Sequence, residues 1–290
     1  MPRTTCYRFR YVSMDMSKKK IHLWKLLKDR GLFPDRKTAT GWIMSGKVLV
    51  DDHPVTKAGH SVAVDARIRI RDYDRKYVGK GGLKLEGALE DFGIDVSGKV
   101  AIDAGASIGG FTDCLLQNGA SKVYAVDAGF GQLAGKLRIN ERVVNMERTN
   151  ISDINPEELD PKPDFATVDL SYLSLTKGIP IVSRLLNPKG EMLCLVKPLF
   201  EVSDSVARRT GKIETPEVYG ELLRRLIDMV EKTGIFPVGV SHSHVTGNKG
   251  TREFFLYISL DAERSDGDIH FDIDHIVAEA MKVPIFQRNN

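Results

Sequence analysis

The sequence predicts an α/β protein built on a doubly wound, mostly parallel sheet, with a small basic α+β module in front of it. Short apolar runs alternate with helix-like stretches over residues 80–262, as expected for parallel strands joined by crossover helices. A glycine-rich turn joins the first of these runs to a helix. Positive charge is concentrated near the N-terminus. Residues 18–76 contain 15 Lys and Arg against 7 Asp and Glu, whereas residues 77–290 have a net charge of −7.

The composition is that of an ordinary globular protein with room for about two domains. The 290 residues are 42% hydrophobic, and no apolar stretch approaches the roughly 20 residues of a membrane span. The N-terminus lacks the apolar segment of a secretory signal, so we expect a cytoplasmic protein without a membrane partner. Cys6, Cys114 and Cys194 are widely separated and fit neither a disulfide framework nor a zinc site. We therefore expect no bound metal, and the oligomeric state is left open.

Changes in composition along the chain predict the domain boundaries. The expected parts are a flexible N-terminus at 1–18, an α+β module at 19–73, a polar linker at 74–79, the sheet domain at 80–262 and a C-terminal extension at 263–290. The extension holds one candidate helix, residues 273–281, to which the sequence assigns no role.

The N-terminal module begins with two short helices. Ile21, Leu23, Leu26 and Leu27 have the spacing of an amphipathic helix, and Gly31 ends it. A second helix starts at residues 34–35, where proline and aspartate form a typical N-terminus, and short strands follow at 48–50, 62–64 and 68–70. This order resembles the S4 RNA-binding domain. The matching residues are Leu26, Gly31, Arg36, Ala39, Ile43, Gly46, Val48, Val50 and Val55.

The S4 resemblance implies that basic side chains of the two helices meet structured RNA, mostly through its phosphates and shape. The candidate RNA-binding residues are Lys25, Lys28, Arg30, Arg36, Lys37 and Lys47. The alternative is a solvated basic face without a ligand.

The glycine-rich turn after residues 100–102 organises the sheet domain. Asp103 follows this apolar run, and three glycines lie within the next seven residues. Glycine lets the backbone approach a ligand, and the helix that follows offers free N–H groups. An acid before the turn suits a ligand with a positively charged amino-acid end, such as S-adenosylmethionine (SAM). Asp127 ends the next run, near the spacing at which a Rossmann unit places its ribose-binding acid. Alternatively, both acids only cap the turns that follow them.

Later strands of the sheet are expected at 143–146, 164–169 and 192–197, and the last two, at 236–240 and 254–258, should form an antiparallel edge. Asp169 and Lys197 end two of these strands. Ligands of open α/β sheets bind at the carboxyl ends of the strands. We therefore expect these two side chains to lie side by side at the functional edge.

The residues at this edge limit the type of methyl acceptor. Cys194 lies inside a predicted strand, which argues against attack on a base by a cysteine nucleophile. Residues 169–172 read Asp-Leu-Ser-Tyr and lack the two prolines that are common where base amino groups are methylated. A ribose hydroxyl needs a base, and a lysine can serve when burial and a second cation lower its pKa from about 10.4.

Four separated residues, Lys84, Asp169, Lys197 and Glu253, match the Lys-Asp-Lys-Glu tetrad of FtsJ-like ribose 2′-O-methyltransferases. With the S4-like module in front, the chain from about residue 19 to 260 resembles the TlyA family of ribosomal RNA 2′-O-methyltransferases, also labelled haemolysins. Residues 103–111, 131–133 and 147–150 match further motifs of that family.

The resemblance implies the roles of the residues. Lys197 would deprotonate or orient the 2′-hydroxyl of a cytidine, Lys84 would assist it, and Asp169 and Glu253 would hold the lysines. The substrate would be ribosomal RNA or an assembled ribosomal subunit. The SAM-binding residues would be Asp103, Gly105, Ser107, Gly109, Gly110, Phe111, Asp127 and Asn150.

Two other functions stay open at this point. The first is an RNA- or ribosome-binding protein that keeps SAM as a non-catalytic ligand, and the complete tetrad argues against it. The second is a haemolysin that disrupts membranes, for which the sequence offers neither an amphipathic membrane helix nor a span.

Overall fold

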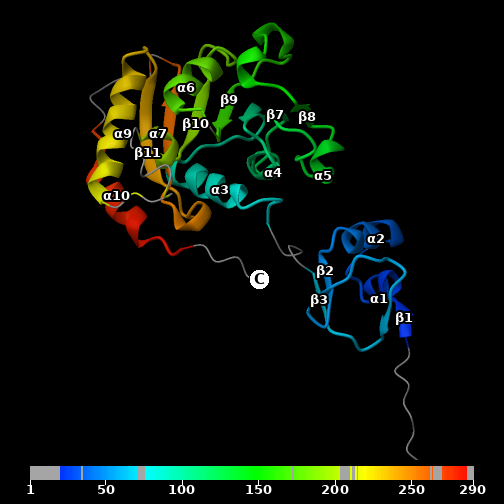
Figure 1. The fold of residues 1–290 in the computed structure, drawn as a ribbon. Helices are drawn as coiled ribbons and strands as arrows, with labels where there is room; N and C mark the ends of the chain where they lie inside the picture. Colours follow the sequence, from blue (N-terminus) through cyan, green and yellow to red (C-terminus); the bar gives the residue numbers. More distant parts are fainter. Residues whose placement is uncertain are drawn as a thin grey trace, which may run out of the picture. The chain divides into compact units, whose positions relative to one another are not determined.

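The chain consists of two compact units, Met1–Arg75 and Lys76–Asn290 (Figure 1). The computed structural model describes residues 20–33, 35–70, 76–171, 173–202, 210, 213, 215–261, 263 and 270–285. The predicted flexible N-terminus at 1–18 lies outside these ranges, as does the segment at 71–75 that joins the units. Within the described ranges, no helix is both long and apolar enough to cross a membrane.

The first unit is a small α+β domain with two short helices and five short strands in its described part. They are β1 Lys20–His22, α1 Leu23–Asp29, α2 Arg36–Met44, β2 Val48–Val50, β3 His53–Pro54, β4 Ser61–Ala63 and β5 Ile68–Ile70. The expectation that Ile21 belongs to the first helix is wrong, because this residue pairs with Val62 in an antiparallel ladder between β1 and β4. Asp35 caps α2 by accepting a hydrogen bond from the Thr38 N–H at 2.8 Å, a common way to satisfy a free donor of a first turn.

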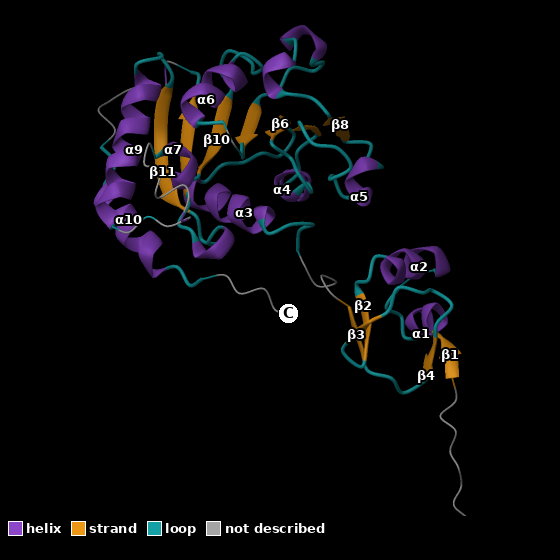
Figure 2. Cartoon of the chain, viewed as in Figure 1, coloured by secondary structure: helices purple, strands orange, loops and turns teal. Residues whose placement is uncertain are grey.

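The second unit is built on a seven-stranded sheet (Figure 2). Its strands are β6 Val100–Ala104, β7 Lys122–Asp127, β8 Val143–Glu147, β9 Phe165–Val168, β10 Glu191–Val196, β11 Phe236–His242 and β12 Phe254–Ser259. The order across the sheet is β11-β12-β10-β9-β6-β7-β8. The five strands from β10 to β8 are parallel, whereas β12 runs antiparallel to both of its neighbours. The predicted antiparallel edge is therefore confirmed, with β12 inserted between β10 and β11.

Helices cover both faces of this sheet. The helices are α3 Gly81–Phe92, α4 Gly110–Gln117, α5 Gly135–Arg138, α6 Leu175–Ser183, α7 Pro198–Glu201, α9 Pro216–Glu231 and α10 Ile273–Lys282, with short 3-10 turns at Ile151–Asp153, Pro156–Glu158 and Asn248–Gly250. Successive strand residues point to opposite faces. Ile102 accordingly packs in one core with α6, α9 and α10, while its neighbour Ala101 packs in the other with α3, α4 and α5.

Candidate active site

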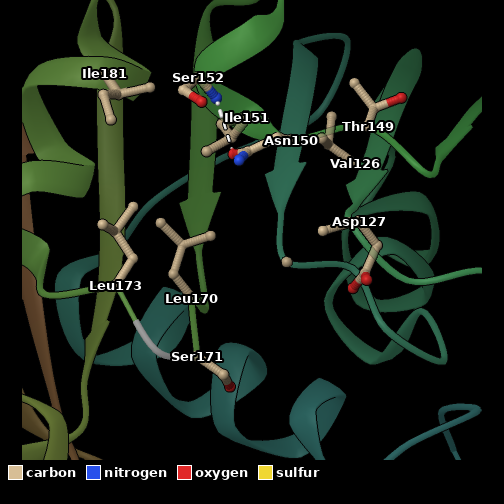
Figure 3. A pocket seen from close by; sticks show the side chains of 12 residues that line it. Val126, Asp127, Thr149, Asn150, Ile151, Ser152, Leu170, Ser171, Leu173 and Ile181 are labelled. Atoms are coloured by element: carbon tan, nitrogen blue, oxygen red, sulfur yellow. Dashed lines mark hydrogen bonds between the residues drawn. The ribbon is translucent and has the colours of Figure 1, made fainter.

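A cavity of about 360 Å³ lies at the carboxyl ends of β6, β7, β8 and β9 (Figure 3). The chain runs from β6 outward through β7 to β8, and then returns to the other side of β6 to add β9 and β10. The cavity is therefore at the point where the strand order reverses, the usual ligand position in a doubly wound sheet. Its lining residues are Gly105, Val126, Asp127, Ala128, Thr149, Asn150, Ile151, Ser152, Leu170, Ser171, Leu173 and Ile181.

The cavity has an apolar side and an acidic side. Leu170, Leu173 and Ile181 gather on one side, and Asp127 extends from the opposite side (Figure 3). The Asp127 carboxylate accepts hydrogen bonds from the backbone N–H groups of Ser107 and Gly129, both at 2.7 Å. Each carboxylate oxygen can accept a second hydrogen bond. A fixed acceptor facing an apolar wall suits a ligand that combines hydroxyl groups with a flat ring.

Gly105 brings the turn after β6 against the end of β9. Its φ is +93°, a region that side-chain-bearing residues rarely adopt. A Cβ atom at this position would also lie only 2.5 Å from the Asp169 carbonyl oxygen. The close approach of these two segments forms one wall of the cavity and requires glycine.

Three of the eight predicted cofactor residues line the cavity, namely Gly105, Asp127 and Asn150. Ser107 lies on the adjoining turn, with its N–H bound to Asp127. The sequence singled out none of the other lining residues as ligand-binding. Most of them are apolar or small, and they come from the ends of β7, β8 and β9 and from α6. A hydrophobic residue after a strand looks the same in sequence whether it packs in the core or lines a cavity.

The expectation that Asp103 ends a strand and faces the ligand is wrong. It lies inside β6 and is fully buried. Its carboxylate accepts hydrogen bonds from the hydroxyl groups of Thr112 at 2.6 Å and Thr167 at 2.9 Å. Burial raises the pKa of Asp103 to about 6, although the two hydroxyl groups oppose that rise. Asp103 therefore connects β6 to α4 and β9 from the interior.

The remaining glycines of the motif and Phe111 also belong to the packing beneath the turn. A Cβ on Gly110 would lie 3.0 Å from the backbone nitrogen of Gly82, so this glycine allows α4 to approach α3 closely. A Cβ on Gly109 would lie 2.2 Å from a methyl group of Leu137. Phe111 is 3% exposed, and its ring centroid is 6.3 Å from that of Phe255. The structure does not place these three residues on the cavity wall.

The four residues of the predicted tetrad form two ion pairs. The first pair joins Asp169, the residue after β9, to Lys197, the residue after β10. This contact is ionic and lacks the geometry of a directed hydrogen bond. The Lys197 ammonium also donates a hydrogen bond to the Ser171 hydroxyl at 3.2 Å. The second pair joins Lys84 of α3 to Glu253, the residue before β12, and each side chain is only 8% exposed.

The strand register brings the two ion pairs to the same edge of the sheet. Val196 of β10 pairs with Phe254 of β12, so Lys197 and Glu253 occupy the next position along the two strands. The first pair also adjoins the cavity. The Asp169 backbone contacts Gly105, and Ser171 both lines the cavity and binds Lys197. A cluster of two cations and two anions thus lies beside the place where a small ligand fits.

The six candidate RNA-binding residues all lie in the first unit. Lys25, Lys28, Arg30, Arg36 and Lys37 are exposed, and Lys47 is half-buried. Two of these residues lie over aromatic rings: the Arg36 guanidinium is 4.7 Å from the Trp24 ring centroid, and the Lys47 ammonium is 5.2 Å from that of Trp42. Arg30 donates a hydrogen bond to the Val64 carbonyl at 2.7 Å. In the described parts of the chain, no cluster of three or more His, Cys, Asp or Glu residues could hold a metal ion.

Comparison with known proteins identifies the family of the chain. Residues 77–260 match the FtsJ-like methyltransferase family. The chain is 40% identical over 270 residues to YqxC of Bacillus subtilis, named as a candidate rRNA methyltransferase, with 92% of this chain and 96% of YqxC covered. It is 37% identical over 237 residues to the Mycobacterium tuberculosis protein named 16S/23S rRNA (cytidine-2′-O)-methyltransferase TlyA, covering 81% and 88% of the two chains.

A solved structure of a candidate hemolysin from Streptococcus thermophilus has 32% sequence identity and a TM-score of 0.67, with 92% of this chain and 97% of that chain covered. Together the sequence and structural matches show that the chain belongs to the FtsJ-like methyltransferase family and, within it, to the TlyA group.

Proposed function

We propose that this protein transfers a methyl group from SAM to the ribose 2′-hydroxyl of a cytidine in ribosomal RNA. The observation that carries the proposal is the cluster of two lysine–carboxylate pairs beside the cavity at the carboxyl edge of the sheet. The named activity of the M. tuberculosis relative supports both the acceptor and the substrate.

The residues of the cavity fit SAM. Its volume of about 360 Å³ lies in the range of small-ligand sites, about 300–1,000 Å³. Asp127 would accept hydrogen bonds from the ribose hydroxyls, and Ile151, Leu170 and Ile181 would pack on the adenine. The backbone at Gly105 would adjoin the amino-acid end. When bound, SAM supplies a methyl group activated by a positively charged sulfur.

The tetrad would bind and prepare the acceptor hydroxyl. Lys197 adjoins the cavity, so its Nζ atom would hold the 2′-oxygen. As a neutral amine it would accept the hydroxyl proton, and as an ammonium it would donate a hydrogen bond that orients the oxygen. Asp169 would fix the Lys197 side chain by the ion pair between them. Lys84 and Glu253 are more buried, and they would position the ribose from the α3 side. Correct placement of reacting groups accounts for a large part of such a rate enhancement.

The first unit would bind the RNA substrate through its exposed basic side chains. Contacts of Lys and Arg with phosphates provide affinity and weaken as the salt concentration rises. The substrate would be free ribosomal RNA or an assembled subunit, which implies a cytoplasmic protein.

The test is transfer of labelled methyl from SAM to ribosomal subunits and to naked ribosomal RNA, followed by nuclease digestion and mass spectrometry of the nucleosides. We expect 2′-O-methylcytidine. Lys197→Met should lower the rate by about 10²–10⁴-fold, the range for loss of an acid–base group, while SAM binding is retained. Lys99→Met is the matched control, because Lys99 pairs with Glu191 near the opposite end of the strands, at the start of β6 and β10, and this variant should keep its activity.

Two outcomes would contradict the proposal. A base-methylated nucleoside would overturn the role given to Lys197, while leaving the cofactor site in place. SAM and RNA binding without methyl transfer to any ribosomal substrate would favour a binding protein.

A further inference from the structure

The loop between β11 and β12, residues 243–253, carries Glu253 to Lys84. A hydrogen bond from the Ser243 N–H to the Glu253 carbonyl at 2.9 Å closes the base of this loop, and one from the Gly247 N–H to the Thr251 carbonyl at 2.8 Å closes its tip. The Gly247 backbone lies directly on the Glu253 carboxylate, since a Cβ there would be 2.3 Å from Oε1. The position of this carboxylate therefore depends on the path of the loop.

Helix α3 holds one side of the β11–β12 loop. The His244 ring forms an ion-pair contact with Asp91 of α3 at 3.0 Å if the histidine is protonated. The Lys80 ammonium, at the start of α3, donates a hydrogen bond to the Thr246 carbonyl at 3.1 Å. These contacts attach the loop to the helix that carries Lys84.

The C-terminal helix α10 holds the other side of the loop. Arg252, next to Glu253, donates hydrogen bonds from its guanidinium to the carbonyl oxygens of Val283 and of Met281, the latter at 3.1 Å. These carbonyls lie at the end of α10, where a helix has unpaired acceptors and the negative end of its dipole. A Cβ on Gly250 would lie 3.1 Å from Ile285, so the tip of the loop also packs against the residues after α10.

Helix α10 is itself firmly attached to the second unit. Ile273, Val277 and Ala280 are buried in the same core as α9. Yet α10 lies beyond residue 260, where the match to the FtsJ-like family ends. Helix α10, which lies outside the family match, thus contacts Arg252, the residue before Glu253 of the tetrad.

We propose that Arg252 and α10 form a positioning element that holds Glu253 against Lys84. The guanidinium fixes the last residue of the loop before Glu253 to a rigid helix end, so the carboxylate keeps one location. This inference rests on the proposed function only for its kinetic readout.

The variant Arg252→Ala tests this role, with Arg224→Ala as the matched control. Arg224 also contacts α10, through an exposed ion pair with Asp274 at 2.6 Å, but its position on α9 is separate from the β11–β12 loop. We expect Arg252→Ala to lower kcat by about 10–100-fold, as a small misplacement of a catalytic group does, with the Kd for SAM unchanged. Arg252→Lys, which keeps a donor and the charge, should recover part of kcat.

Two further measurements separate positioning from a general loss of structure. In a Glu253→Gln background, Arg252→Ala should lower kcat little further, because residues that act through one another are not additive. In the unchanged protein the Lys84 ammonium is buried with its partner Glu253. In Arg252→Ala this amine should become more accessible, so mass spectrometry after reaction with an amine-specific reagent should show faster labelling of Lys84. Arg224→Ala should leave the labelling of Lys84 as in the unchanged protein.

The inference is overturned if folded Arg252→Ala keeps both kcat and the slow labelling of Lys84, or if it loses the same factor of kcat in both backgrounds. The labelling experiment needs no methyl transfer. A protein that transfers no methyl group would therefore refute the proposed function, while Lys84 labelling would still decide the role of Arg252.

Discussion

Replacement of Gly105 by alanine tests whether the cavity depends on the close approach of the turn after β6 to the residue that follows β9. Gly93→Ala is a matched control in the same unit. Gly93 also has a positive φ, +60°, but a Cβ added there would meet no other atom of the described residues within 4 Å. Both variants should lose about 1–2 kcal/mol from the unfavourable backbone conformation. Only Gly105→Ala also forces a Cβ to within 2.5 Å of the Asp169 carbonyl oxygen.

Relief of that contact must move backbone, and we expect it to cost about 1–3 kcal/mol more, as overpacking does. In a domain of this size each kcal/mol lowers Tm by about 2–4 °C, so calorimetry should place the Tm of Gly105→Ala about 2–12 °C below that of Gly93→Ala. Titration calorimetry should show weaker SAM binding for Gly105→Ala alone. Equal Tm values for the two variants, or unchanged SAM binding by Gly105→Ala, would refute this account of the cavity.

Two other predictions concern Asp103 and the basic helices. The raised pKa of Asp103, about 6 in the folded state against 3.8, means that the folded protein favours the protonated form. The penalty for ionisation is therefore absent below about pH 4, grows between about pH 4 and pH 6, and levels off at about 3 kcal/mol above that. Between pH 4 and pH 7, the free energy of unfolding of Asp103→Asn, measured in urea, should rise by up to that amount relative to the unchanged protein. Parallel pH profiles of the two proteins would contradict this prediction. Lys37→Ala should weaken binding to ribosomal RNA and reduce the slope of log K against log salt by about 1, with SAM binding unchanged; an unaltered slope would exclude a phosphate contact.

The sequence was sufficient to predict the sheet, and the structure brings the four residues of the predicted tetrad to one edge of it as two ion pairs. Buried parallel strands appear as apolar runs, and Asp169 and Lys197 directly follow two of them. The expected proximity of Asp169 and Lys197 is found as an ion pair. The contact between Lys84 and Glu253 was not predictable from strand ends, because the packing of α3 on the sheet brings these two residues together. The burial of Asp103 depends on Thr167, a residue of the neighbouring strand β9. A carboxylate before a glycine-rich turn gives no sign of such a partner.

The antiparallel direction of β12 explains how one edge of the sheet collects the whole tetrad. The residue that follows a parallel strand lies at the carboxyl edge, as Asp169 does after β9 and Lys197 after β10. Strand β12 runs the opposite way, so the residue that precedes it, Glu253, lies at this edge. The loop before that residue must then cross this same edge on its way from β11. This path brings it between α3 and the end of α10, where Arg252 meets the carbonyls of the helix. Reversal of a single strand therefore both supplies the fourth tetrad residue and creates the need to hold its loop in place.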